Sequence, residues 1–374
     1  MCRSEVRRIR KKKLIRRIFL YFFILFLLGT GILFGTSYGH NLRLEAAGTI
    51  IATQHRYLAE YAFLPKEELD DLIYKFDHPK WFNSKVEGQN LSPKEIQERK
   101  NKSLNIKIKS INLPESSKRS GMRLTGKLIT ISNPFNVKLV TQKGTQGKER
   151  GEQISVMARR NHALAAVNAS GFSDESGKGG AAIPCGIVIE NGKTIYSADD
   201  NDSPTLVTGL TKYGQMITGS YSAQQLLDKK VVSAAGFIPQ LIVDGEKMFN
   251  GEDPARGYNP RTIMAQKKDG SIMFLIIDGD RNPLSGKMGA KLQECQEILY
   301  ENGAINAMAM DGGSSTILYA MGDIINKPCG EYGDKGGRYL PDAWVVTANK
   351  GQDVKVTIDG KEETQQKIGQ IMEP

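Results

Sequence analysis

Cysteine is scarce in this chain: there are four among 374 residues, and three of them, Cys185, Cys295 and Cys329, lie far from the N-terminal apolar run. Their spacing is not that of a zinc site, and so few cysteines exclude a small scaffold stapled by disulfides. The Gly-x-Ser-x-Gly elbow of serine hydrolases and the Gly-Lys-Ser/Thr end of a P-loop are also absent. The chain therefore needs an ordinary apolar core, and its chemistry must come from other residue types.

Net positive charge is small outside residues 1–17. The formal net charge is +10, but residues 1–17 alone hold nine bases and one acid. Subtracting these from 51 bases and 41 acids leaves 42 and 40, a net charge of +2 for the other 357 residues. A near-neutral body does not offer the extended basic surface that collects nucleic-acid phosphates. We therefore expect no nucleic-acid partner.

One long apolar run follows the basic segment. Residues 18–39 contain no charged Asp, Glu, Lys or Arg, and as a helix they would extend ~33 Å, enough to cross a bilayer core of ~30 Å. We expect a transmembrane signal-anchor at 18–39, with residues 1–17 as a cytoplasmic tail and everything after about residue 40 outside the cell membrane. The alternative is a cleaved signal peptide, for which Ser37-Tyr38-Gly39 is a weak cleavage site.

Residues 40–102 have a helical, polar pattern that predicts a stalk or spacer. Pro65 opens an amphipathic stretch, and Ser92-Pro93-Lys94-Glu95 has the form of a helix capping box. From 350 to 374 the chain is polar, and we expect a tail that frays. Residues 103–349 between them are expected to form the functional domain.

That middle region has short β-branched runs punctuated by Gly, Asn and Pro. Tight hairpin turns are predicted at Asn191-Gly192 and at Asp244-Gly245. The strand pattern of 272–280, the amphipathic helix of 289–302 and the strand pattern of 304–313 together predict a βαβ-like unit. We expect an α+β or mixed α/β fold with a mixed sheet, in which both strands of this unit run into an acid at the edge where ligands bind.

Two segments concentrate reactive side chains. Asn259-Pro260-Arg261-Thr262 leads into a strand, and Asp311-Gly312-Gly313-Ser314-Ser315-Thr316 follows one. Two glycines let the backbone approach a ligand closely, and successive amides with two hydroxyls suit a phosphate. Taken alone, so short a pattern favours a Gly-Gly turn with solvated serines over a phosphate site.

The order of motifs resembles the phosphodiester glycosidase family. The resemblance runs from about residue 103 to 349 and rests on these segments of the sequence: AVNASGF (166–172), IPCGIVIENGK (183–193), NPRT (259–262), IIDGDR (276–281), NAMAMDGGSST (306–316) and GRYLPDAWVV (337–346). The chain departs from the family where Asp-Gly-Arg becomes Asp278-Gly279-Asp280-Arg281, where Gly-Gly-Gly becomes Gly312-Gly313, and where Asn168 is followed by Ala169-Ser170-Gly171.

The resemblance implies hydrolysis of the bond between a sugar and a phosphodiester oxygen. It gives Asp311 as the leading catalytic carboxylate and Asp278 as the second. The residues expected to bind sugar or phosphate are Arg261, Arg338, Arg281, Asn168, Asn259, Gly312, Gly313, Ser314 and Ser315. The expected partner is a glycosyl phosphodiester or cell-surface polysaccharide from cell-wall or exopolysaccharide material. No cofactor is expected, and a divalent cation is left open. The alternatives are a phosphodiesterase that cuts P–O, and a non-catalytic glycan-binding module on the same fold.

Overall fold

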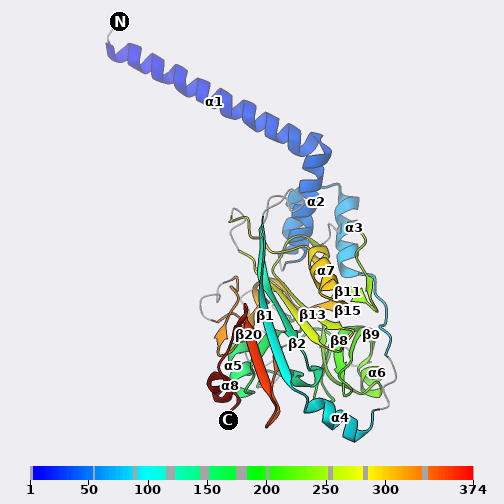
Figure 1. The fold of residues 1–374 in the computed structure, drawn as a ribbon. Helices are drawn as coiled ribbons and strands as arrows, with labels where there is room; N and C mark the ends of the chain where they lie inside the picture. The colour runs from blue at the N-terminus through cyan, green and yellow to red at the C-terminus, as the bar shows by residue number, and fades with distance from the viewer. Residues whose placement is uncertain are drawn as a thin grey trace. The chain divides into compact units, whose positions relative to one another are not determined.

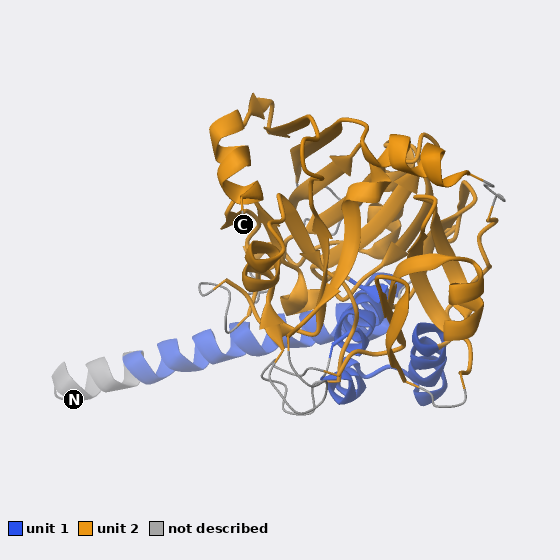
Figure 2. Ribbon diagram, turned by 90° about the horizontal axis from the view of Figure 1, so that it is seen from below, with its two compact units in different colours: residues 1–77, 254–257 blue, residues 78–253, 258–374 orange. Residues whose placement is uncertain are grey.

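The computed structural model describes residues 3–53, 55–86, 91–114, 123–143, 151–173, 183–198, 202–251, 256–280, 285–330 and 336–373. The chain divides into two compact units, residues 1–77 with 254–257 and residues 78–253 with 258–374 (Figure 2). Among the described residues the first unit is helical and the second contains all the strands. Arg281, one of the expected phosphate ligands, lies outside the described residues.

The first unit begins with one long helix and continues with shorter ones. Its elements are α1 (Arg3–Gly35), α2 (Ser37–Ile51), η1 (Arg56–Ala62) and α3 (Lys66–Asp77). Within α1, residues 11–35 are long and apolar enough to cross a membrane, by length and composition. The Thr36 hydroxyl caps α2 by accepting a hydrogen bond from the Gly39 amide at 3.1 Å. Behind it, apolar side chains of α2, η1 and α3 form a small core of their own.

Residues 78–102 belong to the second unit, although the sequence pattern groups them with the stalk. The Ser84 amide donates to the Thr218 carbonyl at 2.9 Å, and the Phe82 amide donates to Gln240 Oε1 at 2.9 Å. Helix α4 (Pro93–Lys100) begins at the predicted capping box, in which Ser92 and Glu95 bond reciprocally.

The second unit is built on three larger sheets and a short two-stranded one. The largest has the order β12-β11-β15-β13-β14-β2-β1-β20-β21. Its strands are β1 (Leu104–Leu113), β2 (Leu124–Ile131), β11 (Gln240–Val243), β12 (Glu246–Lys247), β13 (Arg261–Lys267), β14 (Ile272–Ile277), β15 (Ala304–Ala309), β20 (Val354–Ile358) and β21 (Lys361–Glu362). Figure 1 shows several of them as long, twisted neighbours.

The other sheets have the orders β17-β16-β5-β19-β3, β7-β6-β10-β8-β9 and β18-β4. Their strands are β3 (Val137–Thr141), β4 (Glu152–Gln153), β5 (Ala165–Asn168), β6 (Ile187–Glu190), β7 (Lys193–Ser197), β8 (Thr205–Thr211), β9 (Met216–Tyr221), β10 (Val231–Gly236), β16 (Leu318–Ala320), β17 (Asp323–Ile324), β18 (Tyr339–Leu340) and β19 (Asp342–Val346). The remaining helices are η3 (Pro134–Asn136), α5 (Ile154–Arg160), α6 (Ala223–Asp228), α7 (Leu292–Glu301), η6 (Gly313–Ser315) and α8 (Gln365–Met372).

The main core lies between the largest sheet and the β5 sheet. Phe274 of β14, Leu318 of β16 and Trp344 of β19 are buried together there. Helix α7 packs its apolar stripe, with Leu292 and Leu299, on the other face of the largest sheet. Helix α5 covers the outer face of the β5 sheet. The central strand β14 is buried along its whole length. A strand covered on both faces is apolar throughout, whereas a strand with one exposed face alternates apolar and polar residues.

The predicted local elements are confirmed. Asn191-Gly192 and Asp244-Gly245 have positive φ angles and close the hairpins β6–β7 and β11–β12. Strand β14, helix α7 and strand β15 follow one another as the predicted βαβ-like unit, with β13 inserted between the two strands as an antiparallel neighbour of both.

The expectation of a frayed tail after residue 350 is wrong for residues 354–372. Strand β20 pairs in parallel with β1, from Leu104 opposite Val354 to Ile108 opposite Ile358. Val354, Val356 and Ile368 are buried in the main core. The segment is polar in composition, but its few apolar side chains all point to one face, and pairing with β1 gives that face a core to enter.

Candidate active site

The antiparallel pairing of β13 with both its neighbours brings three predicted site residues to one edge of the largest sheet. Arg261 at the start of β13 pairs with Ile277 at the end of β14, and Ile263 pairs with Ala309 at the end of β15. Asp278 follows Ile277 directly, and Asp311 follows Ala309 after one intervening residue, Met310. The edge therefore gathers two carboxylates and one guanidinium from segments that lie up to 50 residues apart in the sequence.

Asn168, the last residue of β5, ties the second sheet to this edge. Its Nδ2 donates to the Asp311 carbonyl at 2.6 Å, and its Oδ1 accepts from the Thr262 hydroxyl at 2.7 Å and from the Ile317 amide at 3.2 Å. The side chain is 1% exposed. Asn168 therefore holds three segments of the site in place.

The Gly-Gly-Ser-Ser segment forms the short helix η6 instead of an open nest of amides. The Gly313 amide donates to the Pro260 carbonyl at 3.0 Å, and the Ser315 and Thr316 amides donate to the Gly312 and Gly313 carbonyls. Gly313 has φ +59°, which favours glycine. These three amides are occupied by backbone carbonyls, so they hold a tight turn packed on Pro260.

Arg338 provides a cation beside this turn. Its Nη1 donates to the Ser314 hydroxyl at 2.9 Å and to the Ser315 hydroxyl at 3.4 Å. The guanidinium also lies over the ring of Phe172, 5.0 Å from its centroid. Ser315 is fully buried, whereas Ser314 and Arg338 are half-buried. The cation is therefore held in one orientation next to a hydroxyl at the edge of the turn.

Asn259 and Arg261 are fixed by the segment before α7. Asn259 and Ala290 exchange main-chain hydrogen bonds at 3.3 and 2.9 Å, and Arg261 Nε donates to the Ala290 carbonyl at 3.1 Å. Gly289 makes this approach possible, because a Cβ there would lie 2.1 Å from Asn259 backbone atoms. Arg261 remains half-buried, with its guanidinium anchored through Nε.

Asp278 is bound to the loop that follows β17. Its Oδ1 accepts from Asn326 Nδ2 and from the Lys327 amide, both at 3.0 Å. Burial raises the pKa of Asp278 above its ordinary value, against the effect of these hydrogen bonds and of the charges on Lys127 and Lys327. Asn326 also accepts the Leu318 amide, so Asp278 helps to position the start of β16.

Asp342 is an acid of this site that the sequence analysis did not single out. It is 1% exposed at the start of β19 and accepts both the amide and the hydroxyl of Ser170. Burial raises its pKa to about 6, with the hydrogen bonds from Ser170 opposing and the negative charges of Asp311 and Glu190 adding to the rise. The sequence signal for Asp342 lay in the segment GRYLPDAWVV, where an acid stands directly before a buried apolar run.

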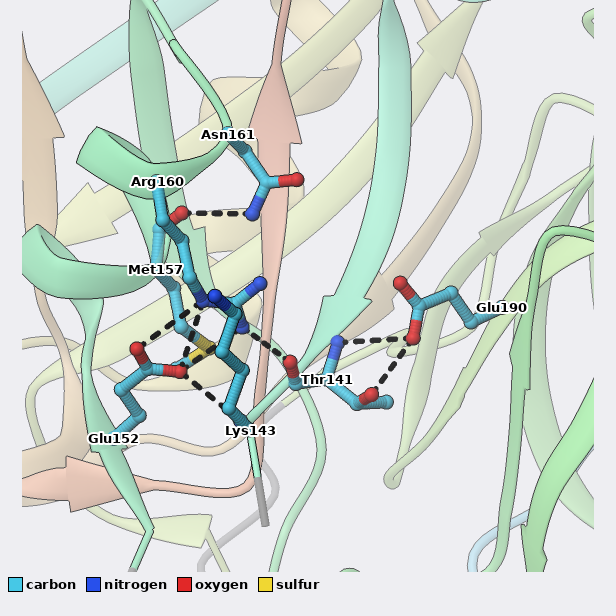
Figure 3. Close-up of polar contacts among 7 residues, drawn as sticks. All are labelled: Thr141, Lys143, Glu152, Met157, Arg160, Asn161 and Glu190. Carbon is cyan, nitrogen blue, oxygen red and sulfur yellow. Dashed lines mark hydrogen bonds and ion pairs between the residues drawn. The ribbon is translucent and has the colours of Figure 1, made fainter.

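Glu190 is held close to this region by a network of hydrogen bonds at the end of β3 (Figure 3). Its Oε2 accepts from the Thr141 hydroxyl at 2.7 Å and from the Thr141 amide at 3.3 Å. Thr141 pairs with Asp342 across β3 and β19. On the other side, the Arg160 guanidinium binds the Glu152 carboxylate at 2.9 Å and the Thr141 carbonyl. The network therefore fixes the end of β3, whose residue Thr141 pairs with Asp342 of β19.

Cys185 is an exposed thiol whose pKa is raised, first by partial burial and then by the negative charge of Asp311. Among the described residues, Cys185, Cys295 and Cys329 form no disulfide with one another. Within the described ranges, no three His, Cys, Asp or Glu side chains are grouped so as to hold a metal ion.

Comparison with known proteins places the fold and this edge in context. The profile of the phosphodiester glycosidase family matches residues 161–347, which include the Asn168, Asp278, Asp311 and Asp342 segments. The chain belongs to the phosphodiester glycosidase family. The solved catalytic domain of zebrafish N-acetylglucosamine-1-phosphodiester alpha-N-acetylglucosaminidase, auto-inhibited by its pro-peptide, shares the fold at a TM-score of 0.54 and 18% identity, over 72% of this chain and 88% of that one.

Two curated proteins show sequence similarity. The N-acetylglucosamine-1-phosphodiester alpha-N-acetylglucosaminidase of Bos taurus is 24% identical over 224 residues, covering 54% of this chain and 40% of its own length. The SPbeta prophage-derived uncharacterized protein YomE of Bacillus subtilis (strain 168) is 24% identical over 185 residues, covering 48% of this chain and 28% of its own. The chain thus spans less than half the length of either relative.

Proposed function

We propose that this protein hydrolyses the bond between a sugar and the phosphate of a glycosyl phosphodiester. The observation that carries the proposal is the convergence of Asp311, Arg261 and Arg338-Ser314 at one edge of two sheets, within the region that matches the family. A glycosyl phosphodiester needs a carboxylate at the anomeric carbon and positive charge at the leaving phosphate. This edge offers both.

Asp311 takes the catalytic role in this proposal. Its main chain is fixed twice, because its amide donates to the Ala169 carbonyl at 3.0 Å and its carbonyl accepts from Asn168. The carboxylate then stabilises the positive charge that develops at the anomeric carbon, or activates the attacking water. Asp278 positions the loop at residues 326–327, and Asp342 positions Ser170, so these two acids support the reacting group without touching substrate.

Arg338 and Arg261 receive the phosphate. A phosphodiester leaves as a stabilised anion, so the site needs fixed cations more than a strong general acid. Arg338 is held by the face of Phe172 and by Ser314, and its planar guanidinium suits bidentate contact with phosphate oxygens. Ser314 adds a hydroxyl beside it.

We also propose where the reaction takes place. The apolar residues from 18 onward in the candidate span anchor the protein in the cell membrane, the basic residues 1–17 stay in the cytoplasm, and the second unit faces outward. Glycosyl phosphodiesters of cell-wall or exopolysaccharide material are the substrates accessible on that side. The activity for which the bovine relative is named supports N-acetylglucosamine as the sugar.

The test uses the full chain in detergent with UDP-N-acetylglucosamine and with a methyl phosphodiester of N-acetylglucosamine. We expect release of free sugar, and in oxygen-18 water the label enters the sugar and not the phosphate. Label in the phosphate would identify a phosphodiesterase that cuts P–O. Absence of sugar release from both substrates, with retained binding of a polymer, would identify a non-catalytic module.

A further inference from the structure

A polar cavity lies at the far end of the strands that carry the candidate active site. It has a volume of about 920 Å³ and is lined by residues on both sides of the β13–β14 turn, including Gln266, Lys267 and Gly270, and by Asn306 at the start of β15. Arg261 is at the opposite end of β13. Six residues of strand separate Arg261 from Lys267, about 20 Å at ~3.3 Å per residue. The cavity is therefore separate from the Asp311 edge.

The cavity is basic. Its lining contains five cations and two carboxylates, an excess of three positive charges: Lys85, Arg99, Lys102, Lys267, Lys268, Asp244 and Asp269. Since the chain outside residues 1–17 carries a net charge of only +2, this excess is a local concentration of positive charge. Such a concave basic surface attracts anions.

Both carboxylates are held by main-chain amides, and Asp269 also interacts with the charge of Lys267. Both oxygens of Asp244 accept the main-chain amide of Lys85 at 3.1 Å, and Asp269 Oδ1 accepts the Ser271 amide at 2.9 Å. Within the described part of the chain, no carboxylate lies within ion-pair distance of the Nζ atoms of the four lysines that line the cavity. Their charges are therefore directed to the cavity and to solvent.

Buried amide side chains hold the cavity walls in place. Gln266, 4% exposed, accepts the Met216 amide at 2.7 Å and donates to the Gly214 and Gly270 carbonyls at 2.8 and 3.0 Å. Asn133, also 4% exposed, donates to the Arg99 and Lys102 carbonyls at 3.0 and 3.2 Å. These contacts join the β8–β9 turn, the β13–β14 turn and the end of α4, so the basic side chains project from a fixed frame.

We propose that this cavity binds a phosphate-bearing glycan away from the catalytic edge. Lysines suit phosphate groups, whereas the amides of Asn105 and Gln215 and the rings of Phe135 and Tyr213 suit sugar hydroxyls and sugar faces. A single cavity with local charge, and not a long basic track, favours an oligosaccharide over a nucleic acid. The proposal does not depend on the hydrolytic activity proposed above. A chain held here would raise the concentration of linked phosphodiesters near the Asp311 edge.

The test measures binding of a fluorescent phosphomannan oligosaccharide to the full chain in detergent, with Asp311→Asn present so that the probe is not cleaved. The cavity variant combines Lys85→Gln, Lys102→Gln and Lys268→Gln, all exposed positions. The matched control removes the same charge at exposed lysines elsewhere: Lys109→Gln, Lys193→Gln and Lys361→Gln. We expect the Kd to rise about 10-fold, equivalent to about 1.4 kcal/mol, in the cavity variant and less than twofold in the control.

Neutral mannan of the same length and a single-stranded oligonucleotide serve as comparison probes, and both are expected to bind at least 10-fold more weakly. The proposal is overturned if phosphomannan does not bind, if the control loses as much affinity as the cavity variant, or if the oligonucleotide binds as tightly. A second readout separates the two sites: with Asp311 intact, the cavity variant should cleave a methyl phosphodiester of N-acetylglucosamine at the unaltered rate. A tenfold loss of that rate would place the cavity in the active site and contradict the proposal.

Discussion

The carboxylate of Asp342 accepts both donors of Ser170, the amide at 2.8 Å and the hydroxyl at 2.6 Å. Both residues are buried, and Ala169 beside Ser170 accepts the amide of Asp311. The pair therefore fixes the loop to which the proposed catalytic residue is attached. It also places an acid whose pKa is raised to about 6 behind the active site.

Asp342 makes stability depend on pH in a defined direction. Because its folded-state pKa lies above the ordinary 3.8, its stabilising contribution is full below about pH 4 and is lost as pH rises through 6. Relative to Asp342→Asn, the wild type should lose about 2–3 kcal/mol of unfolding free energy between pH 4 and 7.5. Urea unfolding at a series of pH values measures this, with exposed Asp228→Asn as the control. Parallel profiles for wild type and Asp342→Asn would contradict the assignment.

Asn168 should matter to stability and activity together. In Asn168→Ala the Thr262 hydroxyl, the Ile317 amide and the Asp311 carbonyl lose a buried partner, so we expect a loss of about 2–4 kcal/mol in unfolding free energy. Thr262→Val, which keeps shape and removes one donor, should cost about 1 kcal/mol. A double-mutant cycle measures their coupling, and strictly additive effects would show that the hydrogen bond does not link them.

Gly312 and Gly369 provide a matched pair of glycines. A Cβ at Gly312 would lie 2.7 Å from the Pro260 carbonyl oxygen, although φ is −113° and any residue could adopt that angle. Gly312→Ala should therefore displace the Asp311 turn and lower the rate of sugar release at least tenfold. A Cβ added at Gly369 in α8 would meet no atom of another segment within 4 Å, so Gly369→Ala should retain full activity and gain about 0.5–1 kcal/mol in stability. Equal activities in the two variants would show that the contact with Pro260 is unimportant.

Features set by neighbouring residues were predictable from the sequence. The Asn191-Gly192 turn needs positive φ, and Ser92 with Glu95 caps its helix through residues three positions apart. The acids Asp278 and Asp311 were found because each directly follows an apolar strand. All these signals act within a few residues.

Features that depend on distant segments were not predictable in this way. The role of Asn168 as a buried support was not predicted, because Thr262 and Ile317, far along the chain, supply its donors. Asp342 shows its importance only once Ser170 lies beside it. The Gly313 amide is occupied because the Pro260 carbonyl approaches it, which no local pattern reveals.

The C-terminal segment should be essential for folding, although its polar composition alone suggests that it is dispensable. A chain ending after Lys350 loses β20, uncovers the edge of β1 and removes the buried Val354, Val356 and Ile368 from the main core. Each such side chain contributes about 2–4 kcal/mol, so we expect the shortened protein to be insoluble or unfolded. A chain ending after Met372 is the control. Soluble protein with an unchanged melting temperature after the longer truncation would show that β20 is dispensable.

The rate of sugar release by Asp311→Asn tests the central claim most directly. The full chain and the variant are compared in detergent on a methyl phosphodiester of N-acetylglucosamine, with melting temperature recorded for both. We predict that the variant keeps the wild-type melting temperature within a few degrees and releases sugar at least about 10³-fold more slowly, because the site loses the charge that acts at the anomeric carbon. A folded variant with a rate within tenfold of the wild type would contradict the account.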